Sequence, residues 1–297
     1  MSKSTRANPL TGTAKHKMHL SSIAATIIQA PTVKDLEEYI PEFVSMTWLE
    51  ENGQVEKIME LKGMNRHDVV MEMFEGRTLP TAMETIRITM ALEGLDMTNV
   101  THILRHRMFG FSAQSSGWGS LEGHDFLHNE AYVQNSELAE RAITLCNDSL
   151  QLYKDALDSG MTFYDARHYM PFCQEQKYMM TGDLKSWMMF INTRLDRTNQ
   201  PTSDNILAAR CRQQLLKFYP MLEAKMPPKP LLGIYMTAIQ SKFNVNTYPP
   251  DKEHAAELKK RGVDWTGITF DNPLPRDEYR CNVPFEHLFN QIINNEV

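Results

Sequence analysis

The sequence predicts an α+β protein, because stretches with the two-residue period of a strand and stretches with the 3.6-residue period of a helix both occur along it. The clearest strand pattern lies at residues 86–93, where apolar and polar side chains alternate. The clearest helix pattern covers residues 136–160. Since 42% of the 297 residues are apolar and 9% are aromatic, the chain can bury a large core, in one large domain or two small ones.

The N-terminal third is expected to hold one strand and several short helices. Residues 1–16 are polar and basic and predict a flexible N-terminal arm, and alternation from Met18 to Ile23 predicts a first strand. Thr32 and Asp35 form a capping-box pattern for a helix in which Pro41 marks a break or an end. Two further helices are expected at about residues 54–59 and 66–74.

A second strand and a helix follow. The strand at 86–93 is expected to end at Gly94, and Asp96 is a suitable N-cap for a helix whose apolar face continues to Leu104. Arg105 and Arg107 therefore leave the end of a helix and enter a loop that is rich in serine and glycine.

The second half of the chain is expected to be mainly helical. The helix over 136–160 stops at Gly160, and a short helical segment surrounds residues 165–167. Residues 177–180 predict a strand that Gly182 and Asp183 turn. Helices over 184–195, with Trp187, Phe190 and Ile191 on the buried side, and over 206–219, which ends before Pro220, complete this part.

The proline-rich residues 227–230 form the one convincing boundary. We expect a main domain over residues 17–228 and a C-terminal extension over 229–297. The extension is interrupted by prolines and weakly periodic, so we expect it to pack on the main body.

Composition excludes some classes of function. A net charge of −6 argues against binding to nucleic acids or anionic membranes. No apolar run reaches the roughly 18 residues of a membrane span, and the polar start lacks the apolar centre of a signal peptide. A cytoplasmic location is expected. Four cysteines lie far apart without the spacing of metal ligands, so we expect free thiols and no metal: Cys146, Cys173, Cys211 and Cys281.

The stretch Arg105-His106-Arg107, followed by Ser112, Ser115 and Ser116, has the chemistry of an anion site. Arginine offers paired donors to phosphate, and hydroxyl groups and loop N–H groups complete such a site. The alternative is a surface turn without a ligand.

Arg105-His106-Arg107, seven residues and then Ser115 resembles the R-H-R-x7-S signature of the flavin-dependent thymidylate synthases, the ThyX family. Other pieces occur in family order. They are Thr81-x-x-Glu84, Asp165-Ala166-Arg167-x-x-Met170-Pro171, Asn192-Thr193-Arg194, and a helix with Arg210 and Arg212. The resemblance covers about residues 18–228.

The resemblance implies a ThyX-like fold, with a central, mostly antiparallel sheet flanked by long helices and an irregular C-terminal extension. It implies a homotetramer whose flavin sites are built from several subunits. It also implies FAD as cofactor and methylenetetrahydrofolate and NADPH as co-substrates, in an enzyme that transfers one carbon to C5 of a deoxypyrimidine monophosphate, by default dUMP to dTMP. In such an enzyme the reduced FAD supplies the hydride.

The resemblance also assigns roles to residues. Flavin binding falls to Thr81, Glu84, Arg105, His106, Arg107, Asn192 and Arg194. Nucleotide binding falls to His102, Gln114, Ser115, Ser116, Gly117, Lys177 and Arg212. Catalysis falls to Ser115 and to Arg210 or Arg212, one of which lies against the pyrimidine.

The departures from the family lie on the nucleotide side. Ala113 and Gly117 stand at a glutamate and an arginine position, His102 at a glutamine position and Lys177 at an arginine position. Two alternatives therefore stay open. The protein could hydroxymethylate or methylate dUMP or dCMP to make a modified nucleotide for viral DNA, in the host cytoplasm, or it could be a flavin- or nucleotide-binding protein without catalysis.

Overall fold

The computed structural model describes residues 14–46, 55–78, 80–117, 119–129, 136–195, 203–228 and 283–297. The strands are β1 (His16–Met18), β2 (Ala24–Gln29), β3 (Arg87–Leu95), β4 (Gly110–Ala113), β5 (Phe126–His128) and β6 (Gln176–Asp183). The longer helices are α2 (Val33–Ser45), α3 (Val55–Lys62), α4 (Arg66–Glu75), α5 (Met97–Ile103), α6 (Ser136–Asp158), α8 (Leu184–Arg194), α9 (Ser203–Phe218) and α12 (Val283–Ile293). Short helical turns are α1 (His19–Ser22), α7 (Phe163–Ala166), η1 (Pro80–Thr85), η3 (Arg167–Tyr169) and η4 (Pro220–Lys225).

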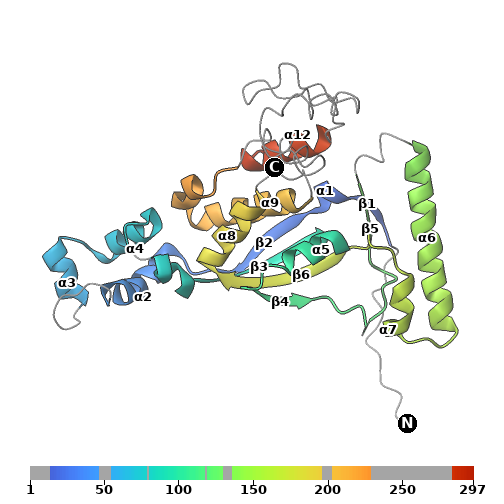
Figure 1. Cartoon of the computed structure of the whole chain (residues 1–297), viewed down its shortest axis with the longest axis horizontal. Helices are drawn as coiled ribbons and strands as arrows, with labels where there is room; N and C mark the ends of the chain where they lie inside the picture. The colour runs from blue at the N-terminus through green and yellow to red at the C-terminus, as the bar shows by residue number, and fades with distance from the viewer. Residues whose placement is uncertain are drawn as a thin grey trace, which may run out of the picture.

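A four-stranded antiparallel sheet forms the centre, in the order β2-β3-β6-β4, and β1 pairs with β5 in a separate parallel ribbon. Helices α8 and α9 lie together along the sheet, and α12 lies on the outer side of α9 (Figure 1). Helices α2, α3 and α4 gather at one end of the molecule, and α6 and α7 stand at the other end. The expected mixed architecture with a mostly antiparallel sheet is confirmed.

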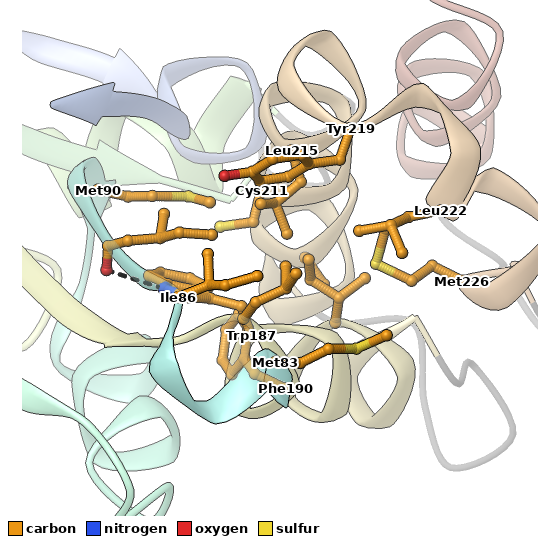
Figure 2. Packing of buried hydrophobic residues seen from close by; sticks show 14 of the residues in the cluster. Met83, Ile86, Met90, Trp187, Phe190, Cys211, Leu215, Tyr219, Leu222 and Met226 are labelled. Carbon is orange, nitrogen blue, oxygen red and sulfur yellow. Dashed lines mark hydrogen bonds between the residues drawn. The ribbon is translucent and has the colours of Figure 1, made fainter. Parts of the chain in front are cut away.

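The core lies between β3, α8 and α9 (Figure 2). Trp187 and Phe190 of α8 are fully buried there, and the indole N–H of Trp187 donates to the carbonyl of Ile88 at 3.1 Å. Leu215 and Tyr219 reach the same core from the other side. Burial of a large apolar side chain contributes about 1.5–3 kcal/mol, so this packing fixes α8 and α9 relative to the sheet.

Caps explain why several helices begin where the sequence predicts. Thr32 and Asp35 cap α2 reciprocally, Asn65 and Asp68 cap α4, and Asp96 caps α5. Each of these side chains satisfies a backbone N–H that the first helical turn leaves unpaired.

Pro41 does not break its helix, so that expectation was wrong. α2 continues to Ser45, although proline removes the N–H that would bond to the carbonyl of Glu37. Arg66 of α4 takes that place, because its Nη1 donates to Glu37 O at 2.9 Å. A side chain from another helix therefore compensates for the missing backbone bond.

The expected first strand at 18–23 was also wrong. The hydroxyls of Ser21 and Ser22 donate to the carbonyl of Met18 and close the helical turn α1, and the strand β2 follows it. The expected turn at Gly182 and Asp183 lies inside β6 instead. Sequence analysis did not predict β1, β2, β4, β5 or α12.

Of the other expected elements, some lie within the described residues and some lie outside them. The strand at 86–93 is confirmed as β3, although Gly94 does not end it, because β3 continues to Leu95. The helices at 136–160, 184–195 and 206–219 are confirmed as α6, α8 and α9. The arm before residue 14 and the segment 229–282 lie outside the described residues.

Candidate functional site

The Arg105–Arg107 loop is held in place by Phe109. This buried ring packs edge-on against Trp187, with 4.9 Å between the ring centroids. It also covers Gly182, where a Cβ atom would lie 2.5 Å from the ring. Glycine is required at 182 because the ring lies so close to the strand backbone. These contacts fix the end of the loop against the N-terminal half of α8.

Arg194, at the end of α8, joins this loop to α5 and α9. Its Nε donates to Nε2 of His106 at 3.1 Å and its Nη2 to the carbonyl of His102 at 3.0 Å. Its Nη1 lies 3.5 Å from Oδ2 of Asp204. Two motifs that are far apart in the sequence, R-H-R and N-x-R, therefore meet through one guanidinium group.

Asp204, at the start of α9, accepts two further hydrogen bonds. Nδ1 of His102 donates to its Oδ2 at 2.6 Å, and Nδ2 of Asn99 donates to its Oδ1 at 2.7 Å. We call Asn99, His102, His106, Arg194 and Asp204 the Asp204 cluster. The Asp204 side chain is only 4% exposed, so the Arg194 guanidinium and these donors compensate for burial of its charge.

Sequence analysis did not single out Asn99 or Asp204. Asn99 and His102 are three residues apart and share one face of α5, which is a signal that a polar partner faces that helix. The partner itself could not be predicted, because it lies more than 100 residues further along the chain.

His106 is held in its neutral form. Burial and, secondarily, the nearby charge of Arg194 lower the pKa of His106 from its usual value of about 6.5. A neutral imidazole can accept the Arg194 hydrogen bond at Nε2, so the electrostatics and the geometry agree.

Arg105 and Arg107 are exposed beside this cluster. Among the described residues neither guanidinium group forms an ion pair or a hydrogen bond, so both keep their donors available. Two free cations next to a preorganised polar cluster suit an anionic ligand such as a diphosphate.

The other predicted flavin residues lie along α8, apart from the cluster. Thr81 and Glu84 are exposed on η1, which packs against α8, and Glu84 pairs with Lys185 at 2.5 Å. Lys185 and Arg194 are nine residues apart, or about 13 Å along a helix. Asn192 faces η4 and donates to the carbonyl of Lys225 at 3.1 Å. One chain thus presents these residues in two separate groups.

The predicted nucleotide residues follow β4. Gln114 and Ser115 are exposed, and the backbone N–H of Gln114 donates to the carbonyl of Lys177. The hydroxyl of Ser116 accepts from Nη1 of Arg167 at 3.1 Å. At Gly117 a Cβ atom would lie 3.1 Å from the Tyr164 ring, so the missing arginine leaves room for this packing.

Lys177 lies on β6 and forms an exposed ion pair with Glu93 at 3.3 Å. Successive side chains of a strand point to opposite faces, so Lys177 points away from Gln176, which lines a cavity beside Ser116. In this conformation the ammonium group is not among the side chains that line that cavity.

Arg210 and Arg212 point in different directions from α9. Arg212 is buried, and it donates to the carbonyl of Met226 at 2.8 Å and to Glu223 at 3.3 Å. Arg210 lines a cavity of about 730 Å³ between α9, β2 and residues 295–297. Its Nη1 donates to Val297 O at 3.1 Å, and its buried Nε has no partner among the described residues.

Comparison with known proteins identifies the family. The model of the family described as "Thymidylate synthase complementing protein" matches residues 32–221, which is more than half of the chain. The chain belongs to this family. The resemblance predicted from Arg105-His106-Arg107 and the other motifs is therefore confirmed.

Curated relatives agree with this assignment. The flavin-dependent thymidylate synthase of Thermococcus onnurineus is 27% identical over 116 residues, which are 38% of this chain and 47% of that protein. The flavin-dependent thymidylate synthase of Pyrococcus furiosus is 25% identical over 117 residues, 38% of this chain and 48% of that protein. The chain spans about half the length of the curated relatives it matches.

Solved structures show a similar fold. The UMP/dUMP methylase PolB from Streptomyces cacaoi, bound with 5-Br UMP, matches with a TM-score of 0.54 at 12% identity. The match covers 73% of this chain and 99% of that chain. Among the described residues no helix is long and apolar enough to cross a membrane.

Proposed function

We propose that this protein transfers a one-carbon unit to C5 of a pyrimidine nucleoside monophosphate, with dUMP to dTMP as the reaction. Membership of the family and the flavin-dependent relatives support this proposal. The observation that carries it is the Asp204 cluster, which brings His106 of the R-H-R motif onto Arg194 of the N-x-R motif. The similar fold of a UMP/dUMP methylase supports a uridine nucleotide as substrate.

The residues present fit FAD. Among the described residues the guanidinium groups of Arg105 and Arg107 have no hydrogen-bond or ion-pair partner, so they can bind the diphosphate. The guanidinium group of Arg194 donates to His106 and to the carbonyl of His102, so it orients His106. Bound FAD would supply the hydride chemistry, with methylenetetrahydrofolate as the one-carbon donor and NADPH as the reductant. The protein's own contribution is to hold the ligands, to place donors near developing negative charge and to keep His106 neutral.

The distance between the two groups of predicted flavin residues supports a homotetramer. Thr81 and Glu84 lie at one end of α8, and Arg105, Arg107 and Arg194 lie at the other. A homotetramer, in which each flavin is shared between subunits, would let residues of different chains meet at one cofactor. Light scattering of the purified protein would test this: a fully active monomer contradicts it.

The catalytic arginine is best placed at Arg210. Its guanidinium group lines a cavity, and its Nε has no hydrogen-bond partner within the described part of the chain, whereas the guanidinium group of Arg212 is buried against η4. Arg210 would lie against the pyrimidine oxygens, and Ser115 is exposed and available to the nucleotide phosphate.

Product analysis tests the proposal. Purified protein is incubated with FAD, NADPH, methylenetetrahydrofolate and either dUMP or dCMP, and the nucleotides are identified by mass spectrometry. We expect dTMP from dUMP. A 5-hydroxymethyl product, or turnover of dCMP alone, would favour the alternative reaction for a modified nucleotide. Protein that binds no flavin and forms no product would contradict the proposal.

Arg194→Ala, Arg194→Lys and Arg77→Ala form a matched set of variants. The guanidinium group of Arg194 contacts His106, the carbonyl of His102 and Asp204, and neither alanine nor lysine can make all three contacts. Both variants at position 194 should therefore bind less flavin than the parent protein. Arg77 is exposed and pairs only with Glu75 among the described residues, so Arg77→Ala should keep its flavin.

A further inference from the structure

Cys146 and Cys173 place two free thiols next to each other, although they are 27 residues apart in the sequence. Their Sγ atoms lie 3.5 Å apart. A disulfide bond is about 2 Å long, so the two sulfur atoms would have to approach by roughly 1.5 Å to be linked. Neither thiol has a part in the function proposed above.

The backbone is anchored on both sides of this thiol pair. The carbonyl of Cys173 accepts from the N–H of Leu127 in β5 at 2.8 Å. On the other side, Cys146 lies in α6, and Oδ1 of its neighbour Asn147 accepts from Nε2 of His16 in β1 at 3.1 Å. Both thiols are therefore held near the same two-stranded ribbon, and their contact does not depend on a mobile side chain alone.

The two thiols differ in how a reagent would meet them. Cys146 is only 3% exposed, whereas Cys173 is partly exposed. A hydrogen bond from the Cys146 thiol lowers the pKa of Cys173, and the same contact together with burial raises the pKa of Cys146. Cys211, in contrast, is fully buried, and burial raises the pKa of its thiol. Since the thiolate is the reactive form, Cys173 is the nucleophile of the pair.

We propose that Cys173 and Cys146 form a redox-active site that reacts with small-molecule disulfides and closes reversibly into a Cys146–Cys173 disulfide. Cys173 is the attacking thiol and Cys146 the resolving thiol. The state of the pair then follows the balance between disulfides and thiols around the protein.

The exchange takes place in two steps. The Cys173 thiolate attacks one sulfur of the small disulfide, so that a mixed disulfide forms and the other half leaves as a thiolate. Cys146 then loses its proton and attacks Sγ of Cys173, which expels the second half. The leaving thiolates take up protons, so two protein thiols are oxidised while one small-molecule disulfide is reduced to two thiols. A dithiol reductant reverses both steps.

The disulfide would tie α6 to the turn before β6. α6 stands at one end of the molecule and packs on α7 and η3 (Figure 1). The residues between Cys146 and Cys173 include both of these elements, so the link closes a loop around them. Because such a link restricts the unfolded chain, the oxidised protein should unfold at a Tm equal to or above that of the reduced protein.

Oxidised glutathione is the probe for this site. The purified protein is incubated with it at neutral pH, the remaining thiols are blocked with iodoacetamide, and the peptides are mapped by mass spectrometry. We expect peptides linked through Cys146 and Cys173, no adduct on Cys211, and return of both thiols after treatment with dithiothreitol. In the reduced protein iodoacetamide should modify Cys173 at least roughly tenfold faster than Cys211, because Cys211 is buried.

Serine variants separate the two roles. Cys146→Ser removes the resolving thiol, so glutathione should stay attached to Cys173 as a mixed disulfide. Cys173→Ser removes the attacking thiol, so the buried Cys146 should gain no adduct. Cys281→Ser is the matched control, because it removes a thiol outside the pair, and it should form the same disulfide as the parent protein. Thermal unfolding of each reduced variant checks that it is folded.

Three results would overturn the inference. The first is a folded parent protein that forms no Cys146–Cys173 link, or forms it only in denaturant. The second is a linked protein whose Tm lies several degrees below that of the reduced protein, because the disulfide would then form only by distorting the fold. The third is a folded Cys146→Ser variant without a glutathione adduct on Cys173, because Cys173 would then not be the attacking thiol.

Discussion

Asp204 connects side chains from three separate parts of the chain. Its carboxylate accepts from Asn99 and His102 of α5 and lies beside Arg194 of α8. Asn99 in turn accepts from Nε2 of His19 at 2.9 Å, so the network reaches the turn before β2. This one buried charge therefore sets the relative positions of the residues proposed to hold the flavin.

Asp204→Asn should lower both stability and flavin affinity. The amide keeps the shape but loses the charge that faces Arg194, and its NH2 group would oppose a donor. Loss of a charge-assisted hydrogen bond of this kind costs about 1.5–3 kcal/mol. Urea unfolding and flavin titration measure the two effects. Asp148→Asn, an exposed change on α6, should alter neither; equal behaviour of the two variants would contradict this role.

His106 makes stability depend on pH. The folded protein lowers the pKa of His106 below about 6.5, so the unfolded chain binds more protons between the two pKa values. Its stabilising contribution is complete above about pH 6.5 and decreases as the pH falls through the folded pKa. His128 acts in the same direction, because burial and His16 lower its pKa.

Thermal unfolding between pH 7.5 and pH 5.5 measures this effect. The parent protein should lose Tm on acidification, and His106→Gln should lose less, because glutamine accepts from Arg194 without titrating. His168→Gln, an exposed change, should follow the parent curve. Parallel curves for the parent and His106→Gln would show that His106 does not contribute.

At the scale of elements, Gly94 shows how a local irregularity is built in. It lies in β3 with φ +69°, at the register shift between Leu92 and Leu95. A Cβ atom at this position would overlap the carbonyl group of Ser22. The glycine thus allows both the bulge and the close approach of α1.

Gly94→Ala should therefore lower the free energy of unfolding by roughly 3 kcal/mol or more, since the strain of the backbone adds to the steric overlap with Ser22. Gly63→Ala is a matched control: Gly63 has φ +65°, but a Cβ atom added there would have no described atom within 4 Å outside its immediate chain neighbours. Gly63→Ala should lower the free energy of unfolding only by the cost of a positive φ for alanine, about 1–2 kcal/mol. Denaturant unfolding compares the two, and equal losses would show that the contact with Ser22 carries no cost.

Local chemistry explains which elements the sequence predicts. Thr32, Asp35 and Asp96 act through neighbours three residues away, so the helix starts could be predicted from short patterns. Pro41 was misjudged because its compensation comes from Arg66, on another helix. Gly182 was taken for a turn residue because the Phe109 ring that requires glycine is about 70 residues away in the sequence.

In the candidate site, too, residues in local motifs could be predicted from the sequence, and residues that act through distant contacts could not. Arg105, His106, Arg107 and Arg194 could be recognised from contiguous motifs. Asp204 could not, because its importance comes from burial and from hydrogen-bond partners that only the fold supplies. The contact between Cys146 and Cys173 also could not be predicted, because the two residues are far apart in the sequence. In the folded protein their Sγ atoms lie 3.5 Å apart.

At the scale of the whole molecule, α12 ties a distant part of the chain to the main body. Its residues Phe289 and Ile292 are buried in the same core as α9, although the sequence analysis predicted no helix there. Residues 295–297, which follow this helix, form one wall of the Arg210 cavity. Packing of α12 therefore contributes both to the core and to the cavity proposed for catalysis.

Phe289→Ala tests whether α12 belongs to one cooperative unit with the sheet. Truncating a fully buried phenylalanine costs about 3–5 kcal/mol, whereas Asn290→Ala on the exposed face should change stability by less than about 0.5 kcal/mol. Unfolding is followed by tryptophan fluorescence, which includes Trp187 in the core, and by far-UV circular dichroism. If α12 folds with the sheet, Phe289→Ala moves both transitions to lower denaturant together, because the core has lost a shared contact. A fluorescence transition that stays at its parent midpoint while part of the helical signal is lost early would instead mean that α12 unfolds separately, and the Arg210 cavity would then open without unfolding of the sheet.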